Sequence, residues 1–156
     1  MNARESLKNA DEALKEHEEI ASLTSGISMR PMLREHKDIV VIKRACGRLK
    51  RNDVPLYSRP GSDKFVLHRV LRQTDEGYVI RGDNLYYNEF VKNEQIIGVL
   101  KAFYRDGKYY DCEKSIVYKL YTVYIRASYP FRRVWKLKLR PLLGRIKRLL
   151  FNYKKC

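Results

Sequence analysis

The sequence predicts a mainly β protein with a short N-terminal helix and a basic, helical C-terminal tail. Short runs of β-branched and aromatic residues recur between turn-forming residues in the central part of the chain, which is typical of antiparallel strands. Before these runs the chain is polar and rich in acids, and after them large apolar residues alternate with cations. The 156 residues therefore divide into three zones, 1–22, 23–114 and 115–156.

Residues 1–22 are expected to form the N-terminal helical segment. Leu7, Ala10, Leu14 and Ile20 follow a weak helical periodicity among charged residues. The segment contains no apolar run of signal-peptide length, so we expect no export signal in it. No stretch of the chain approaches the ~18 consecutive apolar residues of a membrane-spanning helix. We expect a cytoplasmic protein or one that is peripheral on the cytoplasmic membrane.

Residues 23–114 are expected to form a small antiparallel β-domain. A hydrophobic fraction of 44% is sufficient for a modest core in one domain. Asp106-Gly107, between two aromatic runs, is a good signal for a tight hairpin. The candidate strands are 38–43, 54–58, 64–72, 78–81, 96–104 and 108–111.

Residues 115–156 carry most of the net charge of +15. They contain 12 Lys and Arg and no Asp or Glu, so that only +3 belongs to residues 1–114. Pro130 and Pro141 are expected to divide this tail into about three helical pieces. Apolar and aromatic residues among the cations favour peripheral contact with an anionic membrane. The alternatives are a nucleic acid, for which the tail has no motif, and a helix that packs on the β-domain with a solvated cationic face.

The three cysteines argue against a disulfide framework and against a zinc site. Cys46, Cys112 and Cys156 are odd in number, widely spaced and without a Cys-x-x-Cys pattern. Such usage is typical of a reducing compartment. We expect no metal and no cofactor.

Ser28 is the candidate nucleophile. It lies in the sequence Gly-Ile-Ser-Met-Arg-Pro-Met-Leu at positions 26–33. A serine hydroxyl reacts only when a nearby base takes its proton. Gly26 lets the backbone approach a substrate closely, and we expect the amide of Ser28, with one near Gly26, to hold an oxyanion. Met29 and Pro31 are expected to shape the turn and an apolar wall of a cleft.

His68 is the candidate general base. Alternation along residues 65–70 places it on an apolar face of a strand, where burial would keep the imidazole neutral and able to accept a proton. Two acids could orient its ring. One is Asp83, which follows Gly82, and the other is Glu89, six residues further on. Turn chemistry would also explain Asp83, and a solvated surface position would explain Glu89, so the sequence leaves the choice open.

These three boxes, in this order and at this spacing, resemble those of signal peptidase I-like serine peptidases and their LexA-type relatives. The serine box at 26–33 resembles the nucleophile box of the family, and Gly82-Asp83-Asn84 matches its Gly-Asp-Asn box. His68-Arg69-Val70 stands where the bacterial enzymes carry Lys-Arg-Val and where the endoplasmic-reticulum type and archaeal relatives carry His-Arg. Ile97-Gly98-Val99 resembles the closing strand, and the resemblance covers residues 24–105.

The resemblance implies a small signal-peptidase/LexA-like β-fold and a serine endopeptidase that cleaves leader or signal peptides from a peptide or preprotein. Ser28 would be the nucleophile and His68 the base, and in the histidine-type enzymes an acid several residues after the Gly-Asp-Asn box orients the histidine, where Glu89 stands. The sequence departs from the family because it carries no transmembrane anchor before the serine box and little of the second β-domain.

Two other functions are compatible with the same residues. One is a catalytically inactive peptidase fold that binds peptides or a membrane surface. The other is LexA-type self-cleavage in a DNA-binding repressor, which is disfavoured because residues 1–22 are too short and too acidic for a helix-turn-helix domain.

Overall fold

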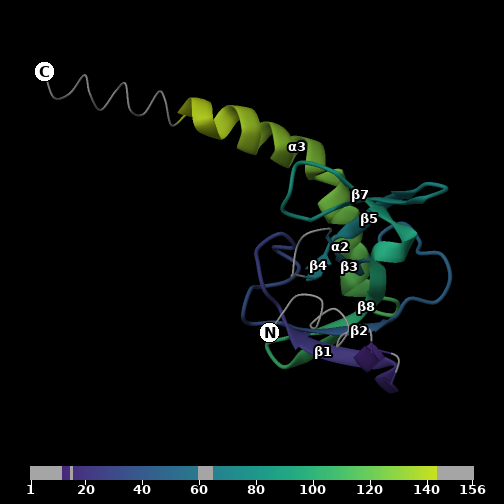
Figure 1. Cartoon of the computed structure of the whole chain (residues 1–156). Helices are drawn as coiled ribbons and strands as arrows, with labels where there is room; N and C mark the ends of the chain where they lie inside the picture. Colours follow the sequence, from purple (N-terminus) through teal and green to yellow (C-terminus); the bar gives the residue numbers. More distant parts are fainter. Residues whose placement is uncertain (1–11, 15, 60–64, 144–156) are drawn as a thin grey trace, which may run out of the picture. The chain divides into compact units, whose positions relative to one another are not determined.

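A computed structural model of the chain describes residues 12–14, 16–59 and 65–143, and these form a mainly antiparallel β protein with a few helices (Figure 1). The predicted fold class is confirmed at this level. The parts of the predicted helical segments at 1–11 and 144–156 lie outside the described residues. The strands are β1 (Glu19–Leu23), β2 (Ile39–Arg44), β3 (Pro55–Ser58), β4 (Phe65–Leu67), β5 (Arg69–Gln73), β6 (Gly77–Arg81), β7 (Glu89–Lys92), β8 (Ile96–Arg105) and β9 (Lys108–Asp111).

Six strands form the larger sheet, in the order β1-β2-β8-β3-β4 with β9 also paired to β8. The ten-residue β8 is its centre, because it pairs with three other strands along its length. β8 and β9 are joined by the predicted hairpin at Asp106-Gly107, and both residues have the positive φ angles, 50° and 76°, that tight hairpin turns require.

The smaller sheet has the order β5-β6-β7. The chain passes into it from the larger sheet at His68, because Leu67 pairs with Leu56 in one sheet and Arg69 pairs with Arg81 in the other. The predicted single strand over 64–72 is therefore wrong, and His68 lies at a crossover between two sheets. A buried cluster contains side chains of both sheets, Tyr57, Val70, Tyr78, Ile80, Val91 and Val99, together with Leu49 from the segment between β2 and β3.

Two strands were not predicted from the sequence. Residues 19–22, expected to be helical, belong to β1, which pairs with β2; helix is present at 12–14 and 16–17. No residue of β1 is buried, and β7 buries only Val91. A strand that buries so little carries no alternation of apolar and polar residues for a sequence pattern to detect.

The chain divides into two compact units, Met1–Lys119 and Leu120–Cys156. The predicted boundary after residue 114 precedes α2 (Ile116–Ala127), and the division falls inside that helix. The second unit continues with α3 (Tyr129–Val134), a π-helical turn η2 (Trp135–Leu139) and helical residues 140–143. No helix of the described segments is long and apolar enough to cross a membrane.

Of the two breaks predicted at the prolines, the one at Pro130 corresponds to a turn at Ser128 between α2 and α3, whereas helix continues through Pro141 to residue 143. Pro130 lies in the first turn of α3, where its missing amide hydrogen leaves no helical bond unmade. Ahead of Pro141 the run widens into the π turn, in which the amide of Arg140 donates to the carbonyl of Trp135. A π turn is one way for a helix to absorb the bond that a proline cannot make.

Candidate active site

The three boxes of the sequence meet in the structure around Gly82. The amide of Asn84 donates to the carbonyl oxygen of Ser28 at 2.8 Å, and its side-chain amide donates to the carbonyl of Ile27 at 3.1 Å. A Cβ atom on Gly82 would lie 2.7 Å from the Ser28 carbonyl oxygen and 3.0 Å from Nε2 of His68. Only glycine allows this approach. The serine turn and the histidine ring are thus held against the same backbone position.

The Nδ1 side of His68 faces a hydroxyl and a carboxylate. Nδ1 lies 3.0 Å from the phenol oxygen of Tyr57 and 3.3 Å from Oε1 of Glu89. The Tyr57 hydroxyl donates its one hydrogen to Oε2 of Glu89 at 2.9 Å, so its oxygen is left to accept from His68. We therefore assign the hydrogen of the imidazole to Nδ1. This tautomer leaves Nε2 with an open lone pair.

Nε2 of His68 is buried and has no hydrogen-bond partner among the residues that the structure describes. Burial lowers the pKa of the imidazole to about 4, while the negative charge of Glu89 acts in the opposite direction and Arg59 lowers the pKa further. The ring is therefore neutral at pH 7. A neutral imidazole with an unoccupied nitrogen is the form in which a general base acts.

Glu89 is the acid that the structure places beside His68. It is the first residue of β7, and its two carboxylate oxygens accept from Nε and Nη2 of Arg59 at 3.1 and 2.6 Å. A guanidinium that binds both oxygens of a carboxylate fixes the plane of that group. Arg59 thereby orients Glu89, and Glu89 with Tyr57 orients the imidazole.

Asp83 has a different partner. It binds Arg69 through two parallel hydrogen bonds of 2.8 and 2.7 Å, and both side chains are buried. Arg69 also donates to the sulfur of Met32 at 3.0 Å, to the carbonyl of Asn52 at 3.0 Å and to the hydroxyl of Tyr118 at 3.0 Å. Asp83 neutralises a buried cation that contacts the serine turn, so its role in this structure is to hold the site together.

The remaining predicted site residues lie in the serine turn. The amide of Gly26 donates to Oε1 of Glu35 at 3.0 Å, so this hydrogen is occupied. In the described part of the chain, no hydrogen bond uses the amide of Ser28, which leaves it available to an oxyanion. Met29 is 4% exposed and belongs to the core, whereas Pro31 is exposed and its carbonyl accepts from Arg105 at 2.8 Å.

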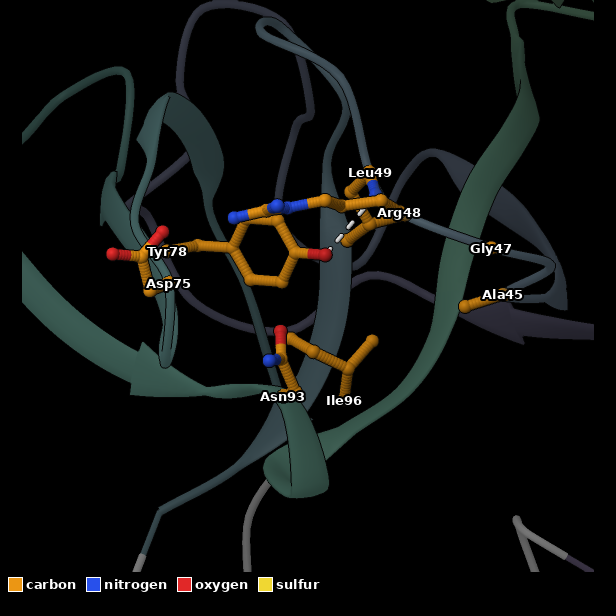
Figure 2. A pocket seen from close by; sticks show the side chains of 8 residues that line it. All are labelled: Ala45, Gly47, Arg48, Leu49, Asp75, Tyr78, Asn93 and Ile96. Atoms are coloured by element: carbon orange, nitrogen blue, oxygen red, sulfur yellow. Dashed lines mark hydrogen bonds between the residues drawn. The ribbon is translucent and has the colours of Figure 1, made fainter.

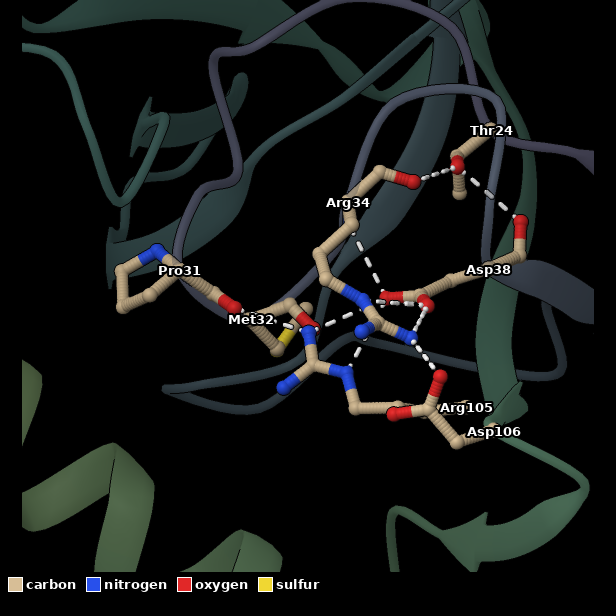
Figure 3. A network of polar contacts seen from close by, with 7 residues as sticks. All are labelled: Thr24, Pro31, Met32, Arg34, Asp38, Arg105 and Asp106. Atoms are coloured by element: carbon tan, nitrogen blue, oxygen red, sulfur yellow. Dashed lines mark hydrogen bonds and ion pairs between the residues drawn. The ribbon is translucent and has the colours of Figure 1, made fainter.

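A buried carboxylate fixes the far end of the serine turn (Figure 3). Asp38 is fully buried and accepts from the guanidinium groups of Arg34 and Arg105. Burial raises the pKa of Asp38, but these hydrogen bonds lower it by more, so that the pKa lies below its ordinary value. Arg105 also donates to the carbonyl of Met32, and the hydroxyl of Thr24 contacts the carbonyls of Arg34 and Asp38. The segment that carries Ser28 is thus anchored to β8.

Sequence reasoning missed Tyr57 and Arg59. Tyr57 lies in a predicted strand and is fully buried, but nothing in that strand distinguishes it from an ordinary core tyrosine. Its place follows from the register of β3 and β4, in which Tyr57 is opposite Val66, two residues before His68. Tyr57 could have been predicted to lie beside His68 only if the pairing of these two strands had been known.

A separate cavity of about 400 Å³ lies away from these residues (Figure 2). The ring of Tyr78 forms part of its wall, and the Tyr78 hydroxyl accepts from the amide of Leu49 at 3.1 Å. None of the site residues lines it. The lining residues are Ala45, Gly47, Arg48, Leu49, Asp75, Tyr78, Asn93 and Ile96.

Comparisons with known proteins give no assignment for this site. No family model matches the chain, and no curated protein matches it. In the described part of the chain, no three His, Cys, Asp or Glu side chains gather where they could hold a metal ion.

Proposed function

We propose that this protein is a serine endopeptidase of the signal peptidase I type, with a small signal-peptidase/LexA-like β-fold, that cleaves leader or signal peptides from a peptide or preprotein substrate. One observation carries the proposal. The buried imidazole of His68 has its Nδ1 side engaged by Tyr57 and Glu89, while Nε2 is open beside the backbone of Ser28.

In the first half of the reaction, Oγ of Ser28 attacks the scissile carbonyl carbon and its proton passes to Nε2 of His68. The new C–O bond makes a tetrahedral intermediate whose oxyanion accepts from the Ser28 amide. Nε2 then gives the proton to the amide nitrogen as the C–N bond breaks, and the amine leaves. Ser28 retains the acyl group as an ester.

In the second half, a water molecule attacks the ester and gives its proton to Nε2. When the C–O bond to Ser28 breaks, the proton returns to Oγ and the carboxylic acid is released. The imidazolium that forms in each half lies 3.3 Å from a Glu89 oxygen on its Nδ1 side. This negative charge offsets part of the cost of charging a buried histidine.

A second candidate function is an inactive peptidase fold that binds peptides. The observation that favours it is that Nε2 of His68 has no hydrogen-bond partner in the described residues, the Ser28 hydroxyl included. Catalytic hydrogen bonds are often long before substrate binds and tighten in the complex. The two functions differ in whether a bound peptide is cut, and one experiment distinguishes them.

The experiment incubates the full chain with precursors that carry leader or signal peptides and reads the products by mass. We expect one cut in wild type, and loss of the cut in Ser28→Ala and His68→Ala. The matched control is Ser25→Ala, which removes an exposed hydroxyl three residues away and should cleave as wild type does. Cleavage by Ser28→Ala at the wild-type rate would overturn the proposal, and binding without cleavage by wild type would establish the inactive module.

A further inference from the structure

A stripe of exposed apolar side chains runs along the helices of the second unit. We call it the apolar stripe, and define it by Leu120, Val123, Tyr124, Phe131, Val134 and Trp135. Their exposed fractions are 66, 64, 59, 70, 47 and 47%. At 100° per residue these positions fall within an arc of about 120°. Monomeric proteins rarely leave such a contiguous apolar surface in water.

The stripe is continuous across the junction of α2 and α3. The amide of Ser128 donates to the carbonyl of Tyr124 at 2.9 Å, and the amide of Arg132 donates to the carbonyl of Ser128 at 2.9 Å. Helical hydrogen bonds therefore run through the junction, and Phe131 follows Tyr124 after two turns on the same side. One helical surface thus carries the whole stripe.

Cations occupy the other side of the same helices. Arg126 and Arg133 fall roughly opposite the apolar stripe at 100° per residue. Of the two cations that follow in and after η2, Arg140 also falls opposite the stripe by this spacing, whereas Lys138 falls on its side. Residues 115–156 contain no acidic side chain. The helices thus combine an exposed apolar side with a purely cationic polar side, which is the pattern of a helix that lies in a membrane interface.

We propose that the apolar stripe lies on an anionic membrane surface. Lipid acyl chains remove the stripe from water, and anionic headgroups meet the long cationic side chains, whose stems can reach along the helix to the polar layer. Tyr124 and Trp135 have the amphipathic rings that favour this depth. A nucleic acid would neutralise the cations and leave the stripe in water. A second copy of the chain would cover the stripe and oppose two surfaces of the same charge.

The proposal is independent of the proposed peptidase activity, and Trp135 provides its test because it is the only tryptophan of the chain. Full-length protein is mixed with vesicles of phosphatidylcholine alone, or of phosphatidylcholine with 30 mol% phosphatidylglycerol, and Trp135 emission and cosedimentation are measured. We expect anionic vesicles to shift the emission to shorter wavelength and to protect it from iodide. We expect binding to neutral vesicles to be at least ten-fold weaker. Ser28→Ala should bind as wild type does, so the result does not depend on catalysis.

Two variants separate the apolar and the electrostatic parts. The double variant Leu120→Ser, Phe131→Ser removes two exposed apolar side chains of the stripe and should weaken vesicle binding at least ten-fold. The matched control is the double variant Tyr87→Ser, Phe90→Ser, which changes two side chains of the first unit that are 56% and 49% exposed. This control should bind vesicles as wild type does. Replacement of Arg133, Lys138 and Arg140 by Gln should weaken binding on the order of 100-fold at low salt.

Three outcomes would overturn the proposal. Trp135 emission that does not respond to anionic vesicles would exclude binding of the apolar stripe to a membrane. An oligonucleotide that displaces the protein from anionic vesicles at equal charge concentration would favour a nucleic acid. Two observations together would favour a second copy of the chain as the group that covers the stripe. These are Trp135 emission that is already at shorter wavelength without vesicles, and an apparent molecular mass in solution that increases with protein concentration.

Discussion

The phenol oxygen of Tyr57 lies 3.0 Å from Nδ1 of His68, and the same hydroxyl donates to Glu89 at 2.9 Å. Glu89 also contacts Nδ1 directly at 3.3 Å. The histidine is therefore oriented by two groups, one neutral and one charged, and their removal should have different consequences. The neutral group fixes the position of the ring, whereas the charged group also alters its proton affinity.

Tyr57→Phe should lower kcat/KM for precursor cleavage about ten-fold, because the ring loses one of two partners and keeps the other. The control is Tyr78→Phe, which removes another buried hydroxyl that accepts from the amide of Leu49 away from the site. Both variants should lose roughly 1–3 kcal/mol of unfolding free energy. An equal loss of cleavage in the two variants would mean that the Tyr57 hydroxyl contributes to the stability of the fold and does not orient His68.

Glu89→Gln should lower kcat/KM further, on the order of 100-fold, because it removes the charge that stabilises the imidazolium. The negative charge of Glu89 raises the pKa of His68. Its loss should therefore move the acidic limb of the pH profile to lower pH, while Tyr57→Phe leaves that charge in place. The measurement is kcat/KM from pH 3.5 to 8 for wild type and both variants. An unchanged limb in Glu89→Gln would contradict this role.

The sequence was sufficient to place Ser28, His68 and the Gly82 box near one another, because each lies in a short motif of fixed order. It was not sufficient to separate Asp83 from Glu89. Both acids lie within reach along the chain, and the choice depends on Arg69 and Arg59, which each bind one of them. Which arginine lies beside which acid depends on strand pairing between segments that are distant in the sequence, and local sequence patterns do not predict that pairing.

The strands show the same division between local and distant causes. The hairpin of β8 and β9 follows from Asp106-Gly107 and was predicted. The crossover at His68 was not, because apolar residues recur on both sides of it and residues 64–72 are typical of one continuous strand. The chain changes sheets there without a glycine or a proline, and only the two sets of partners reveal the break.

Gly82→Ala should cost roughly 1–3 kcal/mol of unfolding free energy and at least ten-fold in cleavage, because the new methyl group meets the Ser28 carbonyl and the His68 ring. Gly47→Ala is the control. Gly47 has a φ of +72° and nothing within 4 Å of an added Cβ, so this change costs strain of about 1–2 kcal/mol and should leave cleavage intact. Urea unfolding and precursor cleavage measure the two effects.

Asp83→Asn should destabilise the fold by roughly 3–5 kcal/mol, because it leaves the buried charge of Arg69 without its carboxylate. The matched control is Glu113→Gln, which removes the carboxylate of an exposed pair with Lys43 at 2.6 Å and should cost about 0–1 kcal/mol. Urea unfolding at pH 7 compares them. Equal small effects would mean that Arg69 and Asp83 do not depend on one another.

The buried histidine should make the fold less stable in acid. The pKa of His68 is about 4 in the folded protein, against 6.5 for an ordinary histidine. Between these values the unfolded chain binds a proton that the folded protein does not, so the unfolding free energy falls as pH decreases from about 6.5 to about 4 and this contribution is constant below that range. The loss from His68 is on the order of 3 kcal/mol. Carboxylates such as Asp38 also titrate in acid, and the variant His68→Asn isolates the histidine. Urea unfolding from pH 8 to 4 should give a steeper fall for wild type than for His68→Asn, and parallel curves would mean that His68 takes up its proton as readily in the folded protein as in the unfolded chain.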